Sequence, residues 1–104
     1  MNLNKLMKQA QKMQEEMAKT QAELEERTVE VSAGGGKVKV TANGAGDVLA
    51  IKIDKTVVDP EDVEILEAMI LSGVQQAIAQ GKELASSEMS KLTGGMGLPP
   101  GLGL

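Results

Sequence analysis

The sequence of 104 residues contains no cysteine, histidine, phenylalanine, tyrosine or tryptophan. Without cysteine and histidine it lacks the usual ligands of zinc, haem and iron–sulfur clusters, a thiol nucleophile, and an imidazole that could act as a general base near neutral pH. Without aromatic rings it offers no platform on which single-stranded bases could stack. Most enzyme classes are therefore excluded, and we expect no catalytic residue, no metal site, no cofactor and no small-molecule substrate.

Long apolar runs are also missing. The longest uninterrupted apolar run near the middle of the chain, residues 68–71, is far shorter than the ~18 residues that a membrane-spanning helix needs. The N-terminus is not followed by an apolar run of the kind that a secretory signal contains. We therefore expect a cytoplasmic protein without a membrane partner. The length favours a single domain over residues 1–93, followed by a flexible tail, 94–104, that is rich in glycine, leucine and proline.

The segment before Thr28 has the seven-residue period of a long amphipathic helix. Its apolar seam repeats through two alternating heptad positions, Leu3, Ala10, Met17 and Leu24 at one and Leu6, Met13 and Thr20 at the other. The residues between them are mostly strong helix formers, and neither glycine nor proline occurs before position 34. The sequence therefore predicts a first long helix.

After Thr28 the apolar period changes from seven to two. Residues 28–32, 38–42 and 48–53 are three β-prone runs, separated by glycine-rich segments at 34–36 and 43–47. This pattern predicts a three-stranded antiparallel meander. Asp59 and Pro60 then match the N-cap and first position of a second long helix, which Thr93 and the two following glycines end. The predicted fold class is α+β, with an α–βββ–α subunit.

The lengths of these elements predict a homodimer. A first helix of roughly 25 residues spans about 37 Å and a second of roughly 32 spans about 48 Å, whereas a strand of about 6 residues reaches only about 20 Å. Both helices must therefore overhang the sheet with their apolar stripes uncovered. A second copy of the chain would cover them, and two-fold symmetry is the usual form of such a dimer. Gly73 and Gly81 inside the second helix indicate close packing there.

The first helix also carries a one-sided set of lysines, which we call the lysine stripe: Lys5, Lys8, Lys12 and Lys19. Their spacing places all four on one face, away from the apolar seam. The helix dipole favours acids at the N-terminus and lysines at the C-terminus, and this helix has the reverse order. A stripe of about 21 Å could follow the phosphates of a polyanion. The alternative interpretation is an ordinary solvated helix face.

Other basic residues are more scattered. Lys82 and Lys91 lie late in the second helix, and Lys37, Lys39 and Lys52 lie on the sheet, where lysines commonly protect strand edges. Arg27 is the only arginine. Since bidentate recognition of guanine usually needs arginine, contacts to DNA would be mainly from lysine to phosphate, with weak sequence selectivity.

Several segments resemble a known family in order along the chain. Residues 6–14, LMKQAQKMQ, resemble the opening helix of the YbaB/EbfC family of bacterial nucleoid-associated proteins. Residues 36–44, GKVKVTANG, resemble its central hairpin, and residues 51–54, IKID, its third strand. Residues 91–95, KLTGG, and 98–101, LPPG, resemble its C-terminal end. The resemblance rests on the ordered set and covers the whole chain.

The resemblance implies an intertwined homodimer whose helices project like tweezers. It implies binding of double-stranded DNA in the bacterial nucleoid, with a role in chromosome organisation or gene regulation. In the family the projecting helices are the proposed DNA contacts, which here adds Lys82 and Lys91 to the lysine stripe as DNA-binding candidates. One alternative remains open, a protein-interaction or chaperone-like module similar to prefoldin, because overhanging methionine-rich helices also suit the binding of client proteins.

Overall fold

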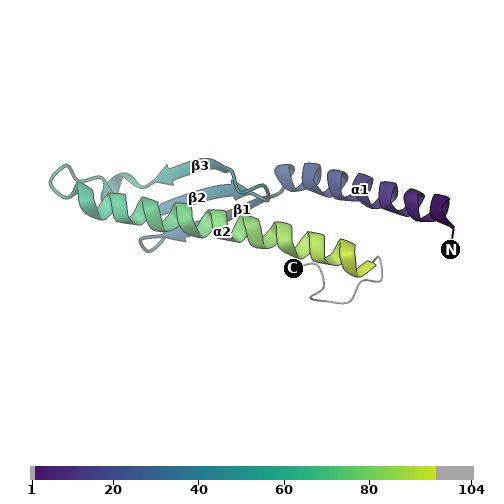
Figure 1. Cartoon of the computed structure of the whole chain (residues 1–104). Helices are drawn as coiled ribbons and strands as arrows, with labels where there is room; N and C mark the ends of the chain where they lie inside the picture. The colour runs from purple at the N-terminus through teal and green to yellow at the C-terminus, as the bar shows by residue number, and fades with distance from the viewer. Residues whose placement is uncertain (1, 96–104) are drawn as a thin grey trace.

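The computed structural model describes residues 2–95 and has the predicted α–βββ–α order (Figure 1). Helix α1 (Leu3–Glu26) is followed by strands β1 (Thr28–Ala33), β2 (Val38–Asn43) and β3 (Val48–Ile53). A short 3-10 helix, η1 (Lys55–Val57), leads to the long helix α2 (Val63–Gly95). The three strands form one antiparallel sheet in the order β1-β2-β3, so the predicted meander is confirmed.

The sheet is shaped by its two turns and one bulge. Gly34, Gly35 and Gly36 connect β1 to β2 with φ values of 60°, 67° and 89°, a region that residues with a Cβ rarely adopt. Thr41 pairs with Ala50 whereas Ala42 pairs with Val48. The residue between them, Leu49, is therefore extra, and it forms a β-bulge near the start of β3.

The core lies between α2 and one face of β1 and β2. Val38, Val40 and Ala42 of the central strand and Ala77 of α2 are fully buried, and Leu66, Met69, Ile70 and Val74 of α2 pack around them. A Cβ on Gly73 would lie 2.8 Å from a methyl carbon of Val40. The close packing predicted at this glycine is therefore confirmed, because only a residue without a side chain lets α2 come this near to the sheet.

Strand β3 is left without a cover. Ile51 pairs with Val40 and Ile53 with Val38, so both isoleucines lie on the same face as the core. Helix α2, however, packs mainly over β1 and β2, and Ile51 and Ile53 stay 42% and 39% exposed. One strand of the apolar face is thus open to solvent in the single chain.

The two helices extend well beyond the sheet, as their lengths predicted. The molecule measures 71 × 23 × 16 Å, and α1 projects from one end of the sheet beside the C-terminal half of α2 (Figure 1). Leu24 near the end of α1 is buried, while Leu3 near its start is 70% exposed. The apolar seam of α1 is therefore covered at the sheet end and open at the far end.

The start of α2 differs from the prediction. The expected N-cap at Asp59 and first helical position at Pro60 were wrong, since the helix begins at Val63. The carboxylate of Asp59 instead accepts a hydrogen bond from the amide of Glu61 at 2.9 Å, and its carbonyl accepts one from the amide of Asp62 at 3.0 Å. These bonds close a turn, which satisfies the backbone before the helix starts.

At the other end, α2 continues to Gly95, and most of the proposed tail, residues 96–104, lies outside the described residues. Within residues 2–95, neither long helix is apolar enough over a sufficient length to cross a membrane.

Candidate nucleic-acid interface

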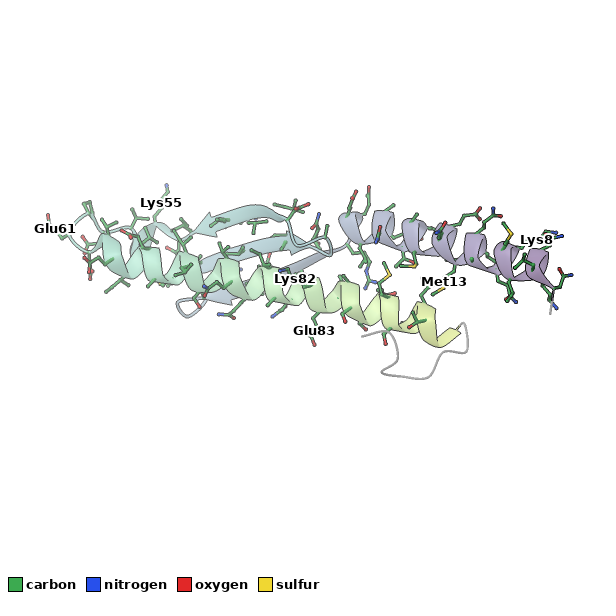
Figure 2. All side chains as sticks on the ribbon, in the orientation of Figure 1. Lys8, Met13, Lys55, Glu61, Lys82 and Glu83 are labelled. Carbon is green, nitrogen blue, oxygen red and sulfur yellow. The ribbon has the colours of Figure 1, made fainter. Side chains whose placement is uncertain are left out.

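The lysine stripe lies on a continuous, well-formed helix. Asn2 caps α1, because its side-chain oxygen accepts hydrogen bonds from the amides of Asn4 at 3.0 Å and Lys5 at 3.4 Å. At about 100° per residue, Lys5, Lys8, Lys12 and Lys19 fall within a sector of about 60° around the helix axis. All four are exposed, and Figure 2 shows Lys8 near the free end of the helix. The structure therefore brings these four residues together on one surface.

The part of this surface nearest the N-terminus carries only positive side chains, because Lys5, Lys8 and Lys12 precede the first acidic residue of α1, Glu15. Closer to the sheet, Glu15, Glu16 and Glu23 lie three or four residues from Lys12 or Lys19. The ion pairs found within residues 2–95 join Arg27 to Glu88, Lys37 to Asp54 and Lys91 to Glu88, and none involves a lysine of α1. The first turn of α1 contains no acidic residue. Since the N-terminal end of a helix already carries a partial positive charge, the dipole adds to the lysines there. The result is a basic helix end on a chain whose formal net charge is −4.

Lys82 and Lys91 do not extend this surface as a pair. Nine residues apart, they point to opposite sides of α2 at about 100° per residue. The aliphatic stem of Lys82 lies near Gly46 in the turn between β2 and β3, half-way along α2 (Figure 2). The ammonium group of Lys91 lies 3.3 Å from the carboxylate of Glu88. The six candidate lysines thus form one group of four and two separate residues.

Glu88 links the two helices at the point where α1 ends. Its carboxylate lies 3.0 Å from the guanidinium of Arg27, the residue that follows α1, and also contacts Lys91. Hydrogen bonds from Arg27 and then Lys91 hold the pKa of the Glu88 carboxyl below its ordinary value. Two cations share one anion here, so the cluster keeps a net positive charge.

The sheet carries a further set of lysines on the face that points away from α2. Lys39 of β2 pairs directly with Lys52 of β3. Only Lys52 can protect a strand edge, because β3 is an edge strand and β2 is the central strand.

The ammonium group of Lys37 lies 3.5 Å from the carboxylate of Asp54. The pKa of the Asp54 carboxyl is lowered mainly by hydrogen bonds from the amide and hydroxyl of Thr56, and also by Lys37.

Nothing in this arrangement points to catalysis. Within the described residues no three acidic side chains lie close enough together to hold a metal ion. A groove of about 430 Å³ between the end of α1, the β2–β3 turn and α2 is lined largely by apolar groups such as Leu24, Ala85 and Met89. The chemistry that the surface supports is the electrostatic binding of a polyanion.

Comparison with known proteins agrees with this chemistry. The chain is 54% identical over 101 residues to a nucleoid-associated protein of Ruminiclostridium cellulolyticum, covering 97% of this chain and 88% of that protein. It is 57% identical over 98 residues to a nucleoid-associated protein of Moorella thermoacetica, covering 94% of each.

The fold is similar to that of the uncharacterized protein HP0035 from Helicobacter pylori, with a TM-score of 0.65 and 21% sequence identity over 77% of this chain and 93% of that one. The model of the YbaB/EbfC DNA-binding family matches residues 1–96. The expectation that the chain is not an enzyme agrees with that description. On these matches, the chain belongs to the YbaB/EbfC DNA-binding family.

Proposed function

We propose that this protein binds double-stranded DNA as a homodimer, mainly through contacts from the lysine stripe to phosphates. Its place is the cytoplasm, on the bacterial nucleoid, where it organises the chromosome and regulates gene expression. The observation that carries the proposal is the lysine stripe itself, four exposed lysines on one face of a projecting helix, none of which takes part in an ion pair within residues 2–95. Lys82 and Lys91 are additional contacts on the second projecting helix.

The dimensions of the stripe suit a nucleic-acid backbone. From Lys5 to Lys19 it runs about 21 Å along the helix, which corresponds to about six phosphate steps of one DNA strand at 3.4 Å each. Lysine carries a point charge on a flexible stem, and it contacts phosphates without reading bases. Arg27 is paired with Glu88, so no free arginine is available for bidentate recognition of guanine. Weak sequence selectivity follows.

The uncovered apolar surface supports the homodimer. Besides β3, it includes Val63, Ile65 and Leu71 of α2, all of them exposed. A monomeric protein rarely leaves so many large apolar side chains in water, and a second copy would bury them in a two-fold dimer. Dimerisation also doubles the number of lysine stripes. The formal charge of the dimer is 2 × (−4) = −8, so DNA must approach through these local basic surfaces.

A mobility-shift titration with duplex DNA tests the proposal. We expect retardation at low salt, with the logarithm of the binding constant falling linearly with the logarithm of the salt concentration, by about 0.9 per neutralised phosphate. Retardation should depend little on sequence. Absence of any shift at low salt and high protein concentration would contradict DNA binding. Sedimentation equilibrium in the same buffer tests the dimer.

A second candidate function is the binding of unfolded or partly folded protein chains. It is favoured by the open end of α1, where Leu3, Leu6 and Met7 are exposed and methionine adapts to varied apolar partners. This function predicts that the protein suppresses the aggregation of a client protein, and that replacing the lysine stripe leaves the suppression unchanged. Loss of suppression together with the lysines would contradict it.

A further inference from the structure

Helix α1 ends against the turn between β2 and β3. We call this place the helix–turn junction; it comprises residues 24–28, residues 43–47 and Gly81 of α2. Asn43 is at its centre. The residue is only 4% exposed and is the one buried polar residue among residues 2–95. The sequence pattern predicts Asn43 as the first residue of the turn, whereas the structure makes it the last residue of β2, paired with Thr28. The pattern gave no sign of its contact with α1.

The two ends of the Asn43 amide have different partners. The oxygen accepts hydrogen bonds from the amides of Ala45 at 3.0 Å and Asp47 at 2.9 Å, which hold the turn. The nitrogen donates to the carbonyl of Glu25 at 3.2 Å. That carbonyl belongs to the last turn of α1, whose carbonyls have no partner within the helix. One half of the side chain therefore shapes the turn, and the other half fastens α1 to it.

Neighbouring backbone groups strengthen the same connection. The amide of Gly44 donates to the carbonyl of Leu24 at 2.9 Å and to that of Arg27 at 3.1 Å. On the other side, a Cβ on Gly81 would overlap the carbonyl oxygen of Asn43, so α2 lies directly against the turn. The end of α1 is thus fixed to the sheet and α2 at one place.

The direction of the lysine stripe depends strongly on this place. Lys5 lies 20 residues before Glu25, about 30 Å along the helix. A rotation of about 10° at the junction therefore moves Lys5 by about 5 Å, more than the length of a charge-assisted hydrogen bond, about 2.8 Å. Farther from the junction, Met13 and Thr20 are half-buried and Leu6 is exposed. The free end of α1 is therefore less well packed than the end at the junction, where Leu24 is buried.

We propose that Asn43 is a positioning residue for DNA binding, and that the hydrogen bond from its side-chain nitrogen to the Glu25 carbonyl sets the direction of the lysine stripe. This inference rests on the proposed function, because it assigns a role in DNA binding to a residue that the DNA does not touch. A fixed direction lets several lysines meet phosphates together without first ordering the helix.

The test is Asn43→Asp. The aspartate keeps an oxygen for the amides of Ala45 and Asp47, so the turn retains its hydrogen bonds, but it has no N–H for the Glu25 carbonyl. Ala45→Asp is the matched control, since it adds the same charge at an exposed position of the same turn and leaves Asn43 unchanged. Thermal unfolding of both variants sets a temperature at which both are folded for the binding measurements.

Two measurements are made. Spin labels at Gln11→Cys and Ser87→Cys report the distance between α1 and α2, and they are the only thiols because the chain has no cysteine. Labelled chain is mixed with an excess of unlabelled chain, so that only distances within one chain are seen. Mobility shifts with duplex DNA give the affinity. We expect a narrow distance distribution in the native chain and in Ala45→Asp, and a broad one in Asn43→Asp.

We also expect Asn43→Asp to bind DNA about two- to tenfold more weakly than Ala45→Asp, the range that the loss of one hydrogen bond gives. Equal distance distributions in the two variants would overturn the positioning role, and so would a broad distribution with equal affinities. If Asn43→Asp does not fold, the native chain alone still tests the proposal, because a broad distribution of distances between α1 and α2 in the native chain would overturn it. If the native chain binds no DNA in the mobility shifts, the proposed function fails. The distance distributions are measured without DNA, so they still report separately whether Asn43 holds α1 in place.

Discussion

Removal of the lysine stripe should change the salt dependence of DNA binding by an amount that the structure sets. We consider replacement of Lys5, Lys8 and Lys12 by glutamine, which keeps helix-forming side chains of similar length. If each lysine neutralises one phosphate, the slope of log binding constant against log salt falls by about 2.7, from three contacts at about 0.9 each. The fall doubles if both stripes of a dimer contact the DNA.

The size of this effect makes it easy to measure. A slope smaller by about 2.7 means that raising salt fourfold, from about 50 to about 200 mM, weakens the native protein about 40-fold more than the variant. Mobility shifts or fluorescence anisotropy with a duplex of arbitrary sequence resolve such a difference. The variant should also bind more weakly at low salt, because its remaining lysines make fewer phosphate contacts.

A matched variant separates position from net charge. Replacement of Lys39, Lys52 and Lys55 by glutamine changes the formal charge by the same amount, from −4 to −4 − 3 = −7, but alters only the sheet face and the segment after it. We expect its salt slope to equal that of the native protein. Equal losses of slope in the two variants would refute the assignment of DNA contacts to α1, as would an unchanged slope in the stripe variant.

Stability provides an internal check on the same reasoning. The stripe places like charges three and four residues apart and puts lysines at the positive end of the helix dipole, and each arrangement costs a few tenths of a kcal/mol. The stripe variant should therefore unfold at the same urea concentration as the native protein or slightly above it. A loss of binding accompanied by unfolding would indicate a structural role for these lysines instead.

Three further predictions concern the dimer, the packing of α2 and the effect of pH. Ile51→Lys should shift the dimer toward monomer in sedimentation equilibrium, whereas Ala50→Lys, on the other face of the same strand, should not; equal behaviour of the two would place the interface elsewhere. Gly81→Ala should lower the free energy of unfolding in urea by up to about 2 kcal/mol, because overpacking against the Asn43 carbonyl costs about 1–3 kcal/mol and alanine gains only ~1 kcal/mol in a helix; a higher stability would show that the turn can withdraw. Because the pKa of the Glu88 carboxyl is lowered in the folded protein, its stabilising effect is present above its ordinary pKa of 4.5 and is lost as pH falls through the folded value. Glu88→Gln should therefore unfold at lower urea than the native protein at neutral pH, and the difference should shrink as the pH falls below 4.5 and through the lowered pKa of the folded protein; a difference that does not change with pH would exclude the ion pair as its cause.

Local sequence was enough to predict the order and type of the elements. The seven-residue repeat of α1 and the change to alternation at Thr28 depend on neighbouring residues alone, and both agree with the structure. Asp59 and Pro60 misled the prediction of where α2 begins. The same polar residues that start a helix can also close a turn before it, and the choice between these depends on where the helix meets the sheet.

The lysine stripe could likewise be read from spacing, because residues on one regular helix hold fixed angles to each other. The relation between Lys82 and Lys91 follows from the same rule and separates them. Contacts between distant segments had no such signal. The hydrogen bond from Asn43 to Glu25 spans 18 positions in the chain, and the ion pair of Arg27 with Glu88 spans many more.

The amino-acid order thus specified the helices, the strands and the basic face of α1, since these arise from periods of a few residues along one backbone. Tertiary structure alone decided which apolar strand stays uncovered, since Ile51 and Ile53 alternate as core residues do but α2 passes over the other two strands. It also decided how α1 is held, because a buried amide finds its partner only when the turn and the helix end meet in space. The spacing of the lysines can be read from the sequence, whereas the direction of the helix that carries them depends on the contact between the turn and the end of α1.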